Sequence, residues 1–138
     1  MELLSVSLGV YYGDFTAAAA AEGLTASQGR TLAVLRRGPS AMRALAITLA
    51  CDASNMTGII DRLEKRGAVR REPSPTDRRV KNVALTEEGE RTVDTIRATM
   101  HATLGRLEAL GEEDRAALAG LLERVFVTAP TAAGSAHQ

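Results

Sequence analysis

Two stretches of the sequence decide the predicted fold: residues 49–67, LACDASNMTGIIDRLEKRG, and residues 77–86, DRRVKNVALT. The first opens on a short turn in which Asp52 is suited to cap a helix, and its last glycine is suited to end one. Apolar residues recur along this helix at the spacing of one buried face, at Met56, Ile59, Ile60 and Leu63. The second stretch has the composition of a short β-strand that leads into another helix. Together they predict a helix followed closely by a β-ribbon.

Three helices are predicted upstream of these stretches. Residues 3–22 carry apolar side chains at helical spacing, and Gly23 is suited to end that helix. Thr25 or Ser27 is suited to cap a second helix that runs to about residue 37. Ser40, which follows a Gly-Pro turn, is suited to cap a third helix that contains the first part of a helix-turn-helix.

Downstream of residue 67 the sequence predicts two strands and two helices. The strands are residues 68–72 and 80–85, joined by a turn whose prolines cannot continue either strand. One long helix begins at Thr86, with a single apolar stripe made by Val93, Ile96, Met100, Leu104, Leu107 and Leu110. A last helix has its apolar residues at Leu118, Leu121, Leu122 and Val125.

This order of elements predicts an α+β fold that is mostly α: a winged helix-turn-helix with N- and C-terminal helices. Because the apolar stripes of these helices offer more surface than the winged core can cover, we expect them to form a dimerisation domain. The predicted dimerisation region comprises residues 1–24 and 87–128. Residues 25–86 form the predicted DNA-binding domain, and residues 129–138 a disordered tail rich in small residues.

The charge of the chain is unevenly distributed. The formal net charge is zero, yet residues 30–81 hold 12 basic residues against five acidic ones, a net charge of +7. A cationic block within a neutral protein indicates a local surface for a polyanion. No stretch approaches the roughly 20 apolar residues of a membrane span, and the start lacks the basic opening of a secretory signal. We therefore expect a cytoplasmic protein that does not contact a membrane.

The outward face of the predicted helix in residues 53–66 has the character of a DNA-reading surface. Its first half is small and polar and its second half cationic, with Ser54, Asn55, Thr57, Gly58, Asp61, Arg62 and Lys65 on that face or its flanks. Short side chains let a backbone approach base edges, and cations bind phosphates. Adjacent arginines, Arg78 and Arg79, with Lys81 nearby, lie at the tip of the ribbon, where a wing enters a minor groove.

The ribbon sequence, an Asp-x-Arg pair followed by Leu-Thr, resembles the wing signature of the MarR (multiple antibiotic resistance regulator) family. Residues 49–67 and the run Thr86-Glu87-Glu88-Gly89 are similar to other segments of that family. The resemblance implies a homodimer joined through its first and last helices and bound to a palindromic operator. It implies a transcription regulator, and promoter occlusion makes repression the expected outcome.

The resemblance also implies roles for individual residues. Ser54, Asn55 and Thr57 are expected to approach bases or phosphates, Arg62 and Lys81 to bind the DNA backbone, and Arg78 or Arg79 to occupy the minor groove. Asp77 is expected to orient a wing arginine. Many relatives have arginine where this chain has Gly58, so base reading by the helix is expected to be weaker. A cavity for a small-molecule effector is implied, with candidates at Tyr11, Tyr12, Arg30, Met42 and Arg43.

Other functional classes have less support. We predict no enzyme, because the sequence offers no Cys-His, Ser-His or carboxylate arrangement beyond chance and no glycine-rich phosphate loop. We predict no metal and no cofactor, because Cys51 and two histidines cannot build a typical site. A redox sensor acting through Cys51 and a winged-helix module that binds protein remain as alternatives, although a small core residue is the more ordinary role for this cysteine.

Overall fold

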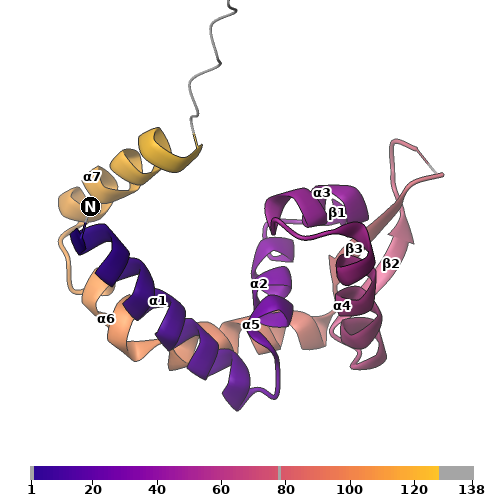
Figure 1. The fold of residues 1–138 in the computed structure, drawn as a ribbon, viewed down its shortest axis with the longest axis horizontal. Helices are drawn as coiled ribbons and strands as arrows, with labels where there is room; N and C mark the ends of the chain where they lie inside the picture. Colours follow the sequence, from indigo (N-terminus) through magenta and orange to yellow (C-terminus); the bar gives the residue numbers. More distant parts are fainter. Residues whose placement is uncertain (1, 78, 128–138) are drawn as a thin grey trace, which may run out of the picture. The chain divides into compact units, whose positions relative to one another are not determined.

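The computed structural model describes residues 2–77 and 79–127, and the chain divides into two compact units, residues 1–103 and 104–138. The first unit begins with helix α1 (Glu2–Ala21), followed by α2 (Ala26–Leu35), the short strand β1 (Ser40–Ala41) and α3 (Met42–Thr48). It continues with α4 (Ala53–Lys65), β2 (Val69–Pro73), β3 (Lys81–Leu85) and α5 (Glu87–Thr99). Figure 1 shows this order along the chain. The prediction of a mostly helical winged helix-turn-helix fold is confirmed.

Local signals set the ends of the first helices as expected. Gly23 follows α1 with a φ of 68°, a conformation that glycine adopts without strain. Thr25 caps α2 in a capping box, in which its hydroxyl accepts from the Gln28 N–H and the Gln28 side chain accepts from the Thr25 N–H. The prediction for Ser40 is wrong, because Ser40 lies in β1 and Ala41 precedes α3 without a side-chain cap.

The sheet has three antiparallel strands in the order β1-β3-β2, one strand more than the sequence predicted. Strand β1 pairs Ser40 with Val83 and Ala41 with Asn82. Strand β2 extends to Pro73, opposite Lys81, contrary to the expectation that proline ends it. Because β2 is an edge strand, a proline without an N–H is tolerated there.

The core of the first unit lies where α2, α3, α4 and α5 meet the sheet. Its largest fully buried apolar side chains are Leu32, Leu45, Met56, Ile60, Leu63 and Val83. Burial of such side chains contributes roughly 1.5–3 kcal/mol each. Within the described residues no helix is long and apolar enough to cross a membrane, and no group of three or more metal-ligating side chains gathers.

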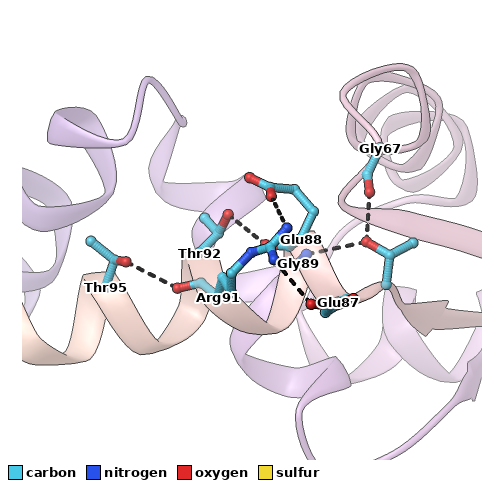
Figure 2. A network of polar contacts seen from close by, with 8 residues as sticks. Gly67, Glu87, Glu88, Gly89, Arg91, Thr92 and Thr95 are labelled. Carbon is cyan, nitrogen blue, oxygen red and sulfur yellow. Dashed lines mark hydrogen bonds and ion pairs between the residues drawn. The ribbon is translucent and has the colours of Figure 1, made fainter.

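The predicted long helix from Thr86 is interrupted. Helix α5 ends at Thr99, Met100 has ψ of 60°, and α6 (His101–Glu108) begins after it. Along α5 the hydroxyls of Thr92, Thr95 and Thr99 each donate to the carbonyl four residues earlier, and Figure 2 shows the first two of these bonds. Such bonds bend helices. The Thr103 N–H is then capped by the Asp14 carboxylate of α1 at 3.0 Å.

The second unit contains the remainder of α6, helix α7 (Glu112–Leu122) and a π-helical turn (Glu123–Val127). All residues of α7 are described, and none of them is buried. Four large apolar side chains of α7 and the turn after it are exposed: Leu121, Leu122, Val125 and Phe126. The predicted tail from residue 129 lies outside the described residues.

The start of α5 packs tightly against the start of β2. Thr86 caps α5 by accepting from the Gly89 N–H, and its hydroxyl donates to the Gly67 carbonyl at 2.5 Å, as Figure 2 shows. A Cβ at Gly89 would lie 2.0 Å from the carbonyl oxygen of Ala68. Backbone therefore occupies the space that any other residue at position 89 would need.

We expect Gly89→Ala to lower the free energy of unfolding by about 2–3 kcal/mol, because overpacking against backbone forces the helix away. The control is Gly58→Ala, also within a helix, where nothing beyond the adjacent residues and backbone of that helix lies within 4 Å of the added Cβ. That change should raise the free energy of unfolding by up to about 1 kcal/mol, the difference in helix propensity. Urea denaturation at matched protein concentration measures both. Equal stability of Gly89→Ala and the unchanged protein would contradict the packing.

Candidate nucleic-acid interface

Helix α4 presents the face that the sequence predicted. Asp52 caps it by accepting from the Asn55 N–H at 2.8 Å, and its apolar face is fully packed: Met56, Ile59, Ile60 and Leu63. Ser54, Asn55 and Thr57 are exposed at its N-terminal end, with Gly58 half-buried among them. The Thr57 hydroxyl donates to the Ala53 carbonyl at 2.9 Å. Small polar groups therefore line the first turns of the outward face.

The wing is the loop between β2 and β3. The Asp77 carboxylate accepts from the Arg79 backbone N–H at 2.9 Å, and the Asp77 carbonyl accepts from the Val80 N–H at 2.9 Å. Asp77 thus shapes the turn through the backbone of the arginine rather than through its guanidinium. The Arg79 and Lys81 side chains are exposed. Arg78 lies outside the described residues, so its assignment to the minor groove stays a prediction.

Five arginines of the cationic block (residues 30–81) are fastened, in that their side chains form hydrogen bonds or ion pairs with other groups of the protein. Arg66, just after α4, donates to the carbonyls of Glu22 and Gly23, which tie that helix end to the end of α1. Arg30 donates to the Tyr12 hydroxyl, and Arg36 forms an ion pair with Asp94. Arg70 pairs with Glu72 and donates to the Leu85 carbonyl. The fifth is Arg71. These side chains act as structural contacts within the first unit.

Arg71 clamps strand β2 to helix α4, the predicted recognition helix. From β2 it forms ion pairs with Asp61, at 2.6 Å, and with Glu64, both on α4. The hydrogen bond to Asp61, with the negative charge of Glu64, raises the pKa of Arg71. The positive charge of Arg71 also offsets part of the negative charge that these two carboxylates place on a helix whose exposed face otherwise carries cations. Sequence reasoning missed this role because nothing local distinguishes Arg71 from Arg70.

The side chains of the other described cations of the block form no hydrogen bond or ion pair within the described part of the chain. They project from the turn after α2, from α3 and α4, from the wing and from the start of β3, and comprise Arg37, Arg43, Arg62, Lys65, Arg79 and Lys81. All six are exposed. Unpaired guanidinium and ammonium groups on neighbouring elements produce the positive potential that attracts a polyanion.

The candidate effector residues separate into two hollows. Tyr11, Tyr12 and Arg30 line one of about 310 Å³ between α1 and α2, together with Phe15, Ala33, Val34, Arg37, Thr48 and Leu49. The Arg30 guanidinium donates to the Tyr12 hydroxyl at 2.8 Å and lies 5.7 Å from the Tyr12 ring centre. Met42 and Arg43 line a different hollow between α3 and α4. The five candidates therefore do not form a single cavity.

Cys51 lies in the turn between α3 and α4. Its side chain is half-buried, and its N–H donates to the Ala46 carbonyl at 3.0 Å. It lines a narrow crevice of about 20 Å³ that Asn55, Ser27 and Arg30 also border.

Residues 24–81, which include the second helix, the helix-turn-helix and most of the wing, match the MarR family. A MarR-family transcriptional regulator from Rhodococcus sp. RHA1 has a solved structure that is 30% identical, with 89% of this chain and 90% of that one covered and a TM-score of 0.69. The chain belongs to the MarR family. The family resemblance noted in the sequence is thereby confirmed.

Three further relatives bear on the function of this MarR-family chain. It is 37% identical over 108 residues to the HTH-type transcriptional repressor NicR of Pseudomonas putida, with 75% of this chain covered. The match spans 66% of that repressor, and 64% of a 31% identical putative regulator of the hcr operon in Thauera aromatica. CouR from Rhodococcus jostii RHA1, crystallised with p-coumaroyl-CoA, is 32% identical with a TM-score of 0.73, covering 89% of this chain and 88% of CouR.

We expect Arg71→Ala to weaken duplex binding roughly tenfold although Arg71 itself is paired within the protein. The change leaves Asp61 and Glu64 as unpaired negative charges on the recognition helix, where they repel phosphates. Adding Asp61→Asn and Glu64→Gln should restore most of the affinity. Fluorescence anisotropy with a labelled duplex measures each variant.

Arg91 on α5 provides a matched control for this experiment. It pairs with two carboxylates, Glu87 and Glu88, in the same manner, so Arg91→Ala makes the same change in charge away from α4. Its effect on duplex binding should be less than about twofold, since exposed pairs contribute little and salt screens distant charge. Equal losses from Arg71→Ala and Arg91→Ala would contradict the clamp.

Proposed function

We propose that this MarR-family chain is a sequence-specific DNA-binding repressor of transcription that works as a homodimer on a palindromic operator and responds to a small organic molecule. One observation carries the proposal: the block's described cations divide into five fastened arginines and six that are exposed without a protein partner. DNA phosphates provide an anionic partner for such groups. Its similarity to the repressor NicR supports the same conclusion.

Helix α4 is proposed to enter the major groove. Ser54, Asn55 and Thr57 lie at its exposed N-terminal end, which approaches base edges in helix-turn-helix proteins. Gly58 has open space around it, so the backbone can come close to the DNA there. Arg62 and Lys65, further along the helix, are placed to bind phosphates.

The wing is proposed to enter the adjacent minor groove. Arg79 is held in its turn by Asp77 and leaves its guanidinium unpaired within the described residues. A narrow minor groove has an enhanced negative potential that attracts arginine. We assign the same groove to Arg78 and a phosphate contact to Lys81.

The dimer is proposed to form through the terminal helices. Helix α1 exposes several large apolar side chains: Leu3, Val6, Leu8, Val10, Tyr11 and Tyr12. Helix α7 and the turn after it expose Leu121, Leu122, Val125 and Phe126. Apolar surfaces of this extent are typical of an interface that a second protomer covers.

An organic effector is proposed for the hollow lined by Tyr11, Tyr12 and Arg30. Its aromatic rings suit an aromatic or other apolar group, and Arg30 and Arg37 suit an anionic one. The relative CouR was crystallised with p-coumaroyl-CoA, a molecule that contains both kinds of group. We place the protein in the cytoplasm, where its operator lies.

We expect Arg79→Ala and Lys81→Ala each to reduce the slope of log affinity against log salt by about one, because each removes one cation that displaces counterions from the DNA, Arg79 in the minor groove and Lys81 at a phosphate. Operator affinity should fall about tenfold in the double variant. Asn55→Ala should instead reduce the preference for operator over random duplex and leave the salt slope unchanged. A salt series with both duplexes measures these quantities.

The control is Arg97→Ala, which removes an exposed cation of α5 and should leave both the salt slope and the preference unchanged. If the double variant binds its operator as tightly as the unchanged protein, the wing does not contact DNA. A chain without duplex affinity even at low salt would support the alternative of a protein-binding module.

We expect a dimer at micromolar concentration in sedimentation, and a footprint of two half-sites whose centres lie about 10–11 bp apart. Recognition helices related by a two-fold axis must meet successive major grooves, which repeat once per helical turn. A folded monomer, or protection of one asymmetric half-site only, would contradict the proposed assembly.

A further inference from the structure

A hollow of about 640 Å³ lies beside the recognition helix and has no role in the contacts described so far. Its walls come from α3, from the turn after it and from the first turns of α4, and are formed by Met42, Arg43, Ala46, Ile47, Ala50, Cys51, Ala53 and Thr57. All but Arg43 and Thr57 are apolar. The hollow is therefore an apolar surface within an otherwise polar and cationic region.

Ile47, which lines this hollow, is unusually exposed for a large apolar residue. Its side chain is 71% exposed, the most exposed large apolar side chain of the helix-turn-helix. Thr57 adds to the apolar character of the hollow. Its hydroxyl donates to the Ala53 carbonyl, which leaves its methyl group as the part of the side chain without a polar contact. The neighbouring alanines leave room beside Ile47 for a small apolar group.

The hollow adjoins the face of α4 that approaches base edges. On α4, Thr57 lies about 60° around the helix axis from Ser54, and Ala53 lies about 100° from Ser54. The hollow is therefore next to the face that carries Ser54. Arg43 stands at the same hollow, exposed and without a hydrogen bond or ion pair in the described part of the chain. An occupant must therefore offer both an apolar group and an anionic one, at the edge of the proposed DNA-binding surface.

We infer that Ile47 contacts the 5-methyl group of a thymine in the major groove while Arg43 binds a phosphate of the same strand, an inference that rests on the proposed function. Thymine is the base that presents an apolar group in the major groove, and apolar side chains recognise it there. Duplex DNA thus meets both requirements of the hollow. Ile47 becomes a specificity-determining residue.

The test begins with an operator selected by the unchanged protein from randomised duplexes. Each thymidine of the operator is then replaced by deoxyuridine, symmetrically in both half-sites, which removes the methyl group and nothing else. One position should lose about fourfold in affinity per half-site, the factor that corresponds to burying one methyl-sized group. The other thymidines provide the controls within the same duplex.

Two variants connect that loss to Ile47. In Ile47→Ala, replacement of the same thymidine by deoxyuridine should no longer change affinity, whereas Ile47→Leu should keep the loss. Ile47 is exposed, so neither variant should shift the unfolding midpoint. Absence of a methyl effect in the unchanged protein, or its persistence in Ile47→Ala, overturns this inference and leaves the proposed function standing. Failure to select any duplex sequence overturns the proposed function itself.

Discussion

The backbone of Gly67 and Ala68 joins the recognition helix, the ribbon and helix α5. The Ala68 N–H donates to the Leu63 carbonyl at 2.9 Å, which closes α4, and its carbonyl accepts from the Thr86 N–H at 3.1 Å. The Gly67 carbonyl accepts from the Thr86 hydroxyl, and Gly89 lies directly against Ala68. Because these are mostly backbone contacts, they hold the wing and α5 against α4 whatever side chains the DNA-facing surface carries. The surface can therefore change its specificity without loss of the fold.

Features that depend on one turn of chain were predictable from the sequence. The caps at Thr25 and Asp52 and the buried face of α4 each follow from residues three or four positions apart. Strand β1 was not predictable, since Ser40 and Ala41 become a strand only by pairing with residues more than 40 positions later. The break at Met100 was hidden for a related reason: the apolar stripe continues in step across it, while the cap of α6 comes from Asp14 on another helix.

The cationic block was predictable from the sequence. Which of its cations have partners within the protein and which do not was not predictable. Neighbouring arginines in a strand point to opposite faces, so the register of β2 on β3 decides that Arg71 meets α4 and Arg70 does not. Arg66 finds carbonyls at the end of α1, 43 and 44 residues away. Such partners are brought together by the tertiary fold, so the spacing of residues near Arg66 in the sequence does not predict them. The net charge of the block therefore overstates the number of positive charges that a polyanion can bind. The cations without a protein partner among the described residues indicate where on the surface a polyanion would bind.

Helix α2 connects the two surfaces for which functions are proposed. Arg30 lines the hollow of Tyr11 and Tyr12, where it donates to the Tyr12 hydroxyl, and it also borders the narrow crevice next to Asn55. Displacement of the Arg30 guanidinium alters the walls of both at once. An anionic group of the proposed effector would compete with the Tyr12 hydroxyl for that guanidinium, because a charge-assisted hydrogen bond is stronger than a neutral one. Because the same side chain borders the crevice beside Asn55, Arg30 is the one charged residue that the two hollows share among their described walls.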